Sequence, residues 1–157
     1  MMNLRAAPFS VIIATIMKIS VRFTAAVHTL LCINYFEKDY RVTSGFIAES
    51  TGVNAVIIRK ILLQLQKAGL VKTAAGVGGS HLLKTPEEIT LLSVYNAVNE
   101  GEDERELFNF HPSPNSQCPI GKNIHRVLDP ALDAAQKAME AELQKTTLAD
   151  LLSQLTQ

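Results

Sequence analysis

The stretch "SGFIAESTGVNAVIIRKILLQLQKAGLVKTAAGVGGSHLLK", residues 44–84, carries the signals that decide the fold. "SGFIAEST", capped by Thr43 or Ser44, predicts a short helix that stops at Gly52. Asn54 then caps a longer helix with dense apolar positions. A short helix, a turn with glycine and a longer helix are the order of elements in a helix-turn-helix motif.

The second half of this stretch predicts a two-stranded hairpin after Gly69, because "LVKTA" and "SHLLK" flank three glycines. Glycine-rich loops also bind nucleotide phosphates, but such a loop must open a helix. Here a second strand-like run follows, and no Gly-Lys-Ser/Thr is present. We therefore predict a wing, and a fold that is mainly α with a small β-wing.

The segments before this region predict one further helix and an extension. In "VRFTAAVHTLLCINY", residues 21–35, the spacing of an amphipathic helix is followed by Phe23, Val27, Leu30, Leu31 and Asn34. Residues 1–16 contain Pro8 and are predicted to be an irregular or partly ordered N-terminal extension. Residues 17–99 then form the winged helix-turn-helix domain.

The segments after the hairpin predict two more helical regions. Thr85 is expected to cap a helix with Pro86 in its first turn, running through "EEITLLSVYNAVN". A polar stretch, an extended "LFNF" and a Pro-rich loop follow. Residues 120–155 are expected to be helical with a break at Asp129-Pro130. An apolar stripe there predicts that residues 100–157 are a linker loop and dimerisation helices; it consists of Leu128, Leu132, Ala135, Met139 and Leu143.

Composition indicates a folded protein that faces a polyanion. The 157 residues are 47% hydrophobic and 19% charged, with zero net charge. Residues 18–81 carry eight Lys and Arg against three Asp and Glu, whereas residues 82–157 carry six against twelve. A basic half suits nucleic acid. The N-terminal apolar run is too short to cross a bilayer, and two cysteines cannot form a disulfide framework, so we expect a cytoplasmic protein with no membrane contact.

The longer helix places its cations on one side. At about 100° per residue, Ile57, Ile58, Ile61, Leu62 and Leu65 form the side expected to face the core. Val56, Arg59, Lys60, Leu63 and Lys67 occupy the other side, which is either a solvated surface or a DNA reader. Arg59 is the strongest candidate because its planar guanidinium can bind a guanine edge with two hydrogen bonds. The predicted DNA-binding residues are Ser44, Asn54, Ala55, Val56, Arg59, Lys60, Gly78, Gly79 and Ser80.

Several motifs resemble one known family. They are "MKIS" at 17, the stretch from residue 44 to 79, "ITLLSVYNAV" at 89, "CPIG" at 118 and "TTLADLL" at 146. Together they resemble the Rrf2 family of bacterial winged-helix transcription regulators, which includes IscR, NsrR and CymR, and its YwnA-like branch. The resemblance implies a homodimer joined through the long C-terminal helix that binds double-stranded DNA at an imperfect palindromic operator, usually as a repressor.

The chain departs from the family pattern in two places. Ser80 and His81 follow the wing glycines, where many members have an aromatic and a basic residue. Cluster-binding relatives have three cysteines before the long helix, whereas this chain has only Cys118 there. A cluster needs about four ligands. We therefore expect no iron–sulfur cluster, no other cofactor and no metal.

The cysteines are candidate redox sensors. Cys118 precedes Pro119 at a predicted helix start, with Lys122 one turn on, and both features lower a thiol pKa. Cys32 is expected to point away from the apolar side of its helix and to be a buried thiol. His111, Cys118 and His125 lack a fourth ligand for zinc. No catalytic set of residues is present, so we do not expect an enzyme.

These features together predict a sequence-specific DNA-binding transcriptional regulator, a homodimeric repressor that responds to thiol oxidation. One alternative is a winged-helix protein-interaction module that has lost DNA binding and docks a partner through Leu63 and Val56. A third hypothesis is a dimer that senses a small ligand between the head and the long helix, although nothing in the sequence locates such a pocket.

Overall fold

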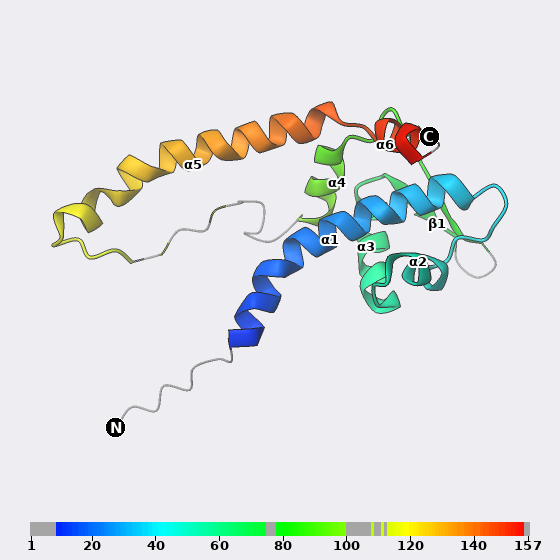
Figure 1. The fold of residues 1–157 in the computed structure, drawn as a ribbon, viewed down its shortest axis with the longest axis horizontal. Coiled ribbons are helices and arrows are strands. Elements are labelled where there is room, and N and C mark those ends of the chain that lie inside the picture. Colours follow the sequence, from blue (N-terminus) through cyan, green and yellow to red (C-terminus); the bar gives the residue numbers. More distant parts are fainter. Residues whose placement is uncertain (1–8, 75–77, 100–107, 109–110, 112, 156–157) are drawn as a thin grey trace, which may run out of the picture.

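The computed structural model describes residues 9–74, 78–99, 108, 111 and 113–155, with side chains from Val21 onward. Its elements are α1 (Phe9–Phe36), α2 (Ser44–Thr51), α3 (Ala55–Lys67), β1 (Val71–Thr73), β2 (Ser80–Leu82), α4 (Leu91–Val98), α5 (Pro119–Lys145) and α6 (Leu148–Leu155). Figure 1 shows α1–α4, α6 and the wing gathered in one head, from which α5 extends. The predicted fold class, a winged helix-turn-helix with a long C-terminal helix, is confirmed.

The core lies where α1 packs on α2, α3 and α4. From α1 it takes a side that is rotated by roughly 100–130° around the helix from the predicted one. The buried residues of α1 are Ala25, Ala26, Thr29, Leu30, Cys32 and Ile33, while Phe23, Val27 and Leu31 are partly buried at the edge. The core face of α1 thus combines small residues with the fully buried Leu30 and Ile33.

Helix α1 begins earlier than the sequence predicted. It runs back to Phe9, so residues 9–16, expected to be irregular or partly ordered, are helical. The reason is that neither glycine nor proline occurs between Phe9 and Phe36, so nothing in the backbone ends the helix. Residues 1–8 lie outside the part of the chain that the structure describes.

Helix α4 begins at Leu91 rather than at the predicted Pro86. Thr85 and Glu88 do interact as a helix start would, since the Thr85 N–H donates to the Glu88 carboxylate at 2.9 Å, but they form only a turn. The chain is extended beyond them because the Ile89 carbonyl accepts from Leu148 N–H at 2.8 Å. Thr90 then caps the new helix through its hydroxyl.

The C-terminal helices also break at a different place. Helix α5 continues through Pro130, and the chain leaves it only at Thr146. A proline removes one intrahelical hydrogen bond, a loss that a solvent-exposed position tolerates because water satisfies the free carbonyl. Thr147 pairs with Thr90 as an isolated bridge, and Leu148 is buried in the core. Helix α6 therefore returns to the head, although the sequence had grouped it with the dimerisation helices.

In the ranges that the structure describes, no helix is both long enough and apolar enough to cross a membrane.

Candidate nucleic-acid interface

The turn between α2 and α3 is held by side-chain caps. The hydroxyl of Thr43 accepts the Phe46 N–H at 3.2 Å, which selects Thr43 over Ser44 as the N-cap of α2. Gly52 ends α2 with φ 67°, a left-handed conformation that glycine adopts without strain. The Asn54 side chain accepts the Val56 N–H at 2.8 Å. Asn54 therefore fixes the start of α3, and its carboxamide oxygen already accepts a hydrogen bond within the protein.

Helix α3 divides into a buried and an exposed side, largely as predicted. Its buried residues are Ile58, Ile61, Leu62 and Leu65. Ile57 was expected with them, but it is 46% exposed. The mean direction of the four buried side chains lies about 90° around the helix from Ile57. Ile57 is therefore at the boundary between the buried and the exposed side.

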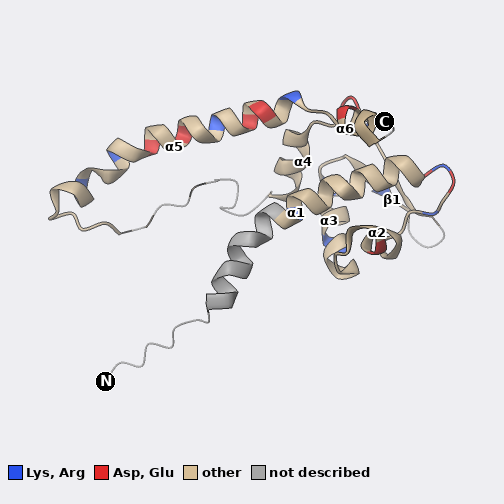
Figure 2. Cartoon of the chain, viewed as in Figure 1, with Lys and Arg blue, Asp and Glu red and all other residues tan. Residues whose placement is uncertain are grey.

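The exposed side of α3 presents Arg59 and Lys60, for which the described residues supply no acidic partner. Arg59 and Lys60 are both exposed, and within the described residues neither forms an ion pair with a carboxylate. The Arg59 Nε donates to the Ser44 hydroxyl at 3.4 Å, so one predicted site residue orients another. Figure 2 shows basic residues on α3 and on the connection between α1 and α2.

The wing is an antiparallel pair in which Val71 faces Leu82 and Thr73 faces Ser80. Two of its predicted DNA-binding residues lie inside the protein. Ser80 is 1% exposed, and its N–H donates to the Val42 carbonyl at 2.9 Å. A Cβ on Gly79 would lie 2.9 Å from the Val42 nitrogen. Because neither residue has surface to offer, we correct their assignment: they hold the wing against the α1–α2 connection.

A groove of about 430 Å³ separates α3 from the wing. Its lining brings together five of the predicted residues and adds Arg41; the five are Ser44, Arg59, Gly78 and the buried Gly79 and Ser80. Arg41 is exposed, and its Nε donates to the Gly78 carbonyl at 3.1 Å. The sequence did not single out Arg41 because it lies in a polar connector, and only its charge indicated a role. The folded chain thus places two arginines on one groove.

The exposed side of α3 also carries apolar residues. Val56 is 52% and Leu63 65% exposed, and Ala55 is partly buried beside them. Side chains of this size can contact thymine methyl groups or an apolar partner. The geometry of α3 is compatible with both interpretations of the sequence.

Comparison with known proteins decides the family. The model of the family described as "Rrf2: Iron-dependent Transcriptional regulator" matches residues 19–154. This chain belongs to the Rrf2 family. It is 40% identical to the Bacillus subtilis protein YwnA over 137 residues, which cover 87% of this chain and 98% of YwnA.

Solved structures agree with this assignment. A crystal structure of a Lactobacillus plantarum protein is 30% identical and superposes with a TM-score of 0.72, covering 87% of this chain and 90% of that one. The structure of T. potens IscR has the same fold at 20% identity, with a TM-score of 0.63 and coverage of 98% and 89%. Rrf2 proteins are transcriptional regulators and not enzymes, so the chain is a transcriptional regulator.

The iron in the family's description does not fit the residues of this Rrf2 protein. Its two cysteines lie apart, Cys32 buried in the head and Cys118 at the start of α5. Across the described residues, no three His, Cys, Asp or Glu side chains are grouped to hold a metal ion. His111 and His125 do come together, but as stacked rings with centroids 6.0 Å apart. An iron–sulfur cluster needs about four ligands, and the described part of the chain offers no set of residues for one.

Cys118 occupies the N-cap position of α5 in this Rrf2 protein. The backbone N–H of Gly121, and then that of Ile120, lower the pKa of the Cys118 thiol. These N–H groups belong to the first turn of α5, where no intrahelical carbonyl accepts them. Cys32 is buried, as predicted, but it belongs to the core face of α1 instead of pointing away from it.

Proposed function

We propose that this Rrf2 regulator binds double-stranded DNA sequence-specifically as a homodimeric repressor at an imperfect palindrome, in the cytoplasm. The observation that carries the proposal is the exposed cationic side of α3, where Arg59 and Lys60 have no acidic partner within the described chain. Cations that remain unpaired in the folded protein are available to phosphates and guanine edges.

Helix α3 enters the major groove in this proposal. Arg59 reads a base edge, Lys60 binds phosphate, and Ala55 and Val56 contact thymine methyl groups. Ser44 supports the assignment of Arg59, because its hydroxyl holds the Nε and leaves the terminal nitrogens of the guanidinium to face DNA. Gly78 and Arg41 lie across the groove on the wing side, where the backbone of a DNA strand would pass.

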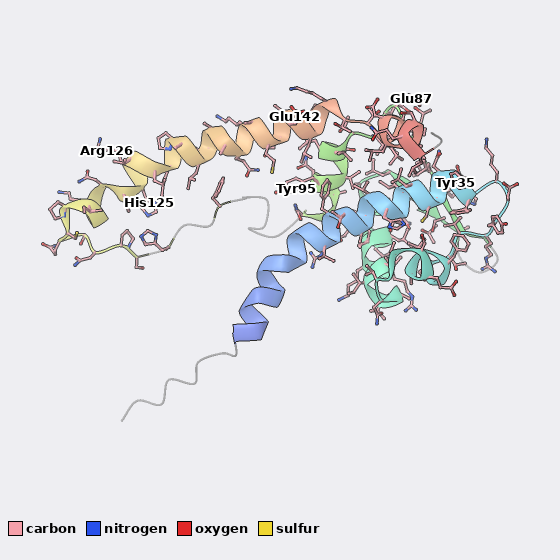
Figure 3. All side chains as sticks on the ribbon, viewed as in Figure 1. Tyr35, Glu87, Tyr95, His125, Arg126 and Glu142 are labelled. Atoms are coloured by element: carbon pink, nitrogen blue, oxygen red, sulfur yellow. The ribbon has the colours of Figure 1, made fainter. Side chains whose placement is uncertain are left out.

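The homodimer forms through α5. No residue of this 27-residue helix is buried in the single chain, although Leu132, Met139 and Leu143 lie on one side at helical spacing. At 1.5 Å per residue the helix is about 40 Å long, which gives an extended surface for a second copy. Figure 3 shows side chains projecting from α5 on both sides, with His125 and Arg126 in its first half and Glu142 near its end. We therefore propose a head of residues 17–99 together with α6, an N-terminal extension of residues 1–16, and dimerisation through α5.

Thiol oxidation is the proposed signal, and the protein acts with no cluster and no cofactor. Cys118 suits this role because its pKa is lowered at the start of the helix that joins the two copies. Oxidation there would change the charge at the edge of the dimer contact.

Electrophoretic mobility shift with the DNA upstream of the protein's own gene tests the function. We expect binding that falls steeply as salt rises, because cations that contact phosphates release counterions. Arg59→Ala should cost about 1–3 kcal/mol of binding free energy and relax the preference at one base pair. Lys60→Ala should weaken binding to all DNA sequences to the same extent. Binding that is absent at low salt, or insensitive to Arg59→Ala, would contradict the proposal.

A second candidate function is a protein-interaction module that docks an apolar partner on α3. The exposure of Val56 and Leu63 favours it. Affinity for such a partner would depend little on salt and would fall with Leu63→Ala rather than with Lys60→Ala. The same salt series therefore separates the two functions.

A further inference from the structure

A second groove, of about 550 Å³, runs along α1 on a face that the proposed DNA contacts do not use. Val27, Leu31 and Tyr35 line it from α1, Ser50 from the end of α2, and Leu155 from α6. None of the described residues that line it is Lys, Arg, Asp or Glu. Tyr35 lies near the C-terminal end of α1, close to α6 (Figure 3).

The groove contains a thiol connected to an imidazole through one hydroxyl. The Cys32 Sγ donates to the Ser50 Oγ at 3.3 Å. The same hydroxyl lies 3.0 Å from the His28 Nε2. Since a hydroxyl has one proton, Ser50 can accept from the thiol and donate to His28 when the imidazole carries its own proton on Nδ1. The three side chains form a path for a proton from sulfur to a ring nitrogen.

We propose that this groove binds a small uncharged compound with a conjugated carbonyl group, and that Cys32 adds to it. In the reaction a bond forms between Sγ and the β-carbon of the ligand, and the electron pair of its C=C bond moves toward the carbonyl oxygen. The thiol proton passes through Ser50 to His28 and then to the α-carbon. Neither an oxidant nor a reductant is required.

The lining selects this class of ligand. The wall is mostly apolar and its described residues include no Lys, Arg, Asp or Glu, so it disfavours ionic compounds because no fixed charge there compensates their desolvation. The rings of Tyr35 and Phe36, both in the lining, offer flat surfaces to a conjugated molecule. The volume lies within the range of about 300–1,000 Å³ typical of small-molecule sites. Hydrogen peroxide is much smaller than this groove. A role for Cys32 in peroxide oxidation alone would therefore not account for the groove.

We expect the reaction at Cys32 to change the position of α3 as well, and this part of the inference rests on the proposed DNA binding. Ser50 belongs to α2, which ends two residues later at Gly52 and leads through the capped turn into α3. A ligand bonded to Cys32 removes the thiol proton from the contact between α1 and α2 and occupies the space beside Ser50. We therefore expect α2 to shift and DNA affinity to fall.

Labelling of the full-length protein by N-ethylmaleimide, an uncharged conjugated carbonyl compound, tests the site. Peptide mass spectrometry follows Cys32 and Cys118 separately, so Cys118 is an internal control. General-base assistance is commonly worth a factor of about 100 or more, and we expect His28→Phe and Ser50→Ala to slow labelling of Cys32 by at least about tenfold. Ser50→Thr, which keeps the hydroxyl, should restore it, and labelling of Cys118 should not change.

Two further measurements complete the test. Leu155→Trp fills the groove without altering the three reacting side chains, so it should slow labelling by N-ethylmaleimide but not oxidation by hydrogen peroxide. The proposed site would be overturned if Cys32 were labelled at the same rate in all variants. It would also be overturned if Cys32 were labelled only as fast as the whole protein unfolds. Labelled protein that binds DNA as tightly as unlabelled protein would overturn the regulatory role. If unlabelled protein binds no DNA at all, the proposed function fails, while the labelling rates still decide the site.

Discussion

Replacement of Gly79 by alanine is expected to loosen the wing from the head. The new Cβ would lie 2.9 Å from the Val42 nitrogen and 3.1 Å from the Val42 oxygen, and both are backbone atoms that cannot rotate away. The strand β2 must move, which weakens the 2.9 Å hydrogen bond between Ser80 N–H and the Val42 carbonyl. Overpacking of this kind costs about 1–3 kcal/mol, and the free energy of unfolding should fall by that amount.

Urea and thermal unfolding, followed by circular dichroism, measure the effect. For a chain of this length about 1 kcal/mol corresponds to a change of about 2–4 °C in Tm. Gly45→Ala is the matched control, because Gly45 lies in α2 and its nearest atom to an added Cβ is the Thr43 hydroxyl at 3.7 Å. Alanine there should be neutral or stabilise the helix by up to about 1 kcal/mol.

An unfolding midpoint of Gly79→Ala equal to that of the unmodified protein would refute this account of the wing. It would mean that β2 can accommodate a Cβ at position 79 despite the 2.9 Å distance to the Val42 nitrogen. If DNA binding is confirmed, the same variant should also lose affinity, because Gly78 and Arg41 border the groove beside α3.

Three further predictions concern other regions. Leu148→Ala should lower the free energy of unfolding by about 2–5 kcal/mol in a urea titration, since Leu148 is buried, whereas the exposed Leu155→Ala should change it by less than about 0.5 kcal/mol. The Thr147 N–H and hydroxyl lower the pKa of Asp150, so its stabilising contribution is present above the pKa of an unfolded Asp and is lost as pH falls through the lowered value. Asp150→Ala should thus reduce the difference in stability between pH 7 and pH 3, measured by thermal unfolding, and an unchanged difference would contradict the role of this carboxylate. Because the pKa of Cys118 is lowered, its alkylation by iodoacetamide should persist to lower pH than that of a free thiol, and a rate profile matching the free thiol would count against the effect of the α5 N-terminus.

The caps and turns of the helix-turn-helix could be predicted from the sequence because their causes are local. Asn54 caps α3 through a nitrogen two residues away, and Gly52 ends α2 through its own backbone conformation. The cationic side of α3 followed from helical periodicity, which depends only on residue spacing. Arg59 and Lys60 therefore lie at the surface as predicted.

Predictions failed where a distant segment competes with a local signal. Thr85 and Pro86 resemble a helix start, but Ile89 pairs with Leu148 across the head and keeps the chain extended. Pro130 resembles a break, yet α5 continues through it, and the break occurs where Thr147 meets Thr90. Thr90 and the Thr147–Asp150 pair are local caps of the observed helices, but only the pairing across the head selects these starts over Pro86 and Pro130.

The sequence by itself determined the order of helices and wing, their caps, and the positive side of α3, since each of these depends on residues within one or two helical turns. Only the tertiary structure decided that Ser80 is buried on Val42, that Arg41 shares a groove with Arg59, and that Cys32 is connected through Ser50 to His28. These contacts join segments far apart along the chain. Their geometry depends on how the whole core packs, and no local pattern of residues encodes it.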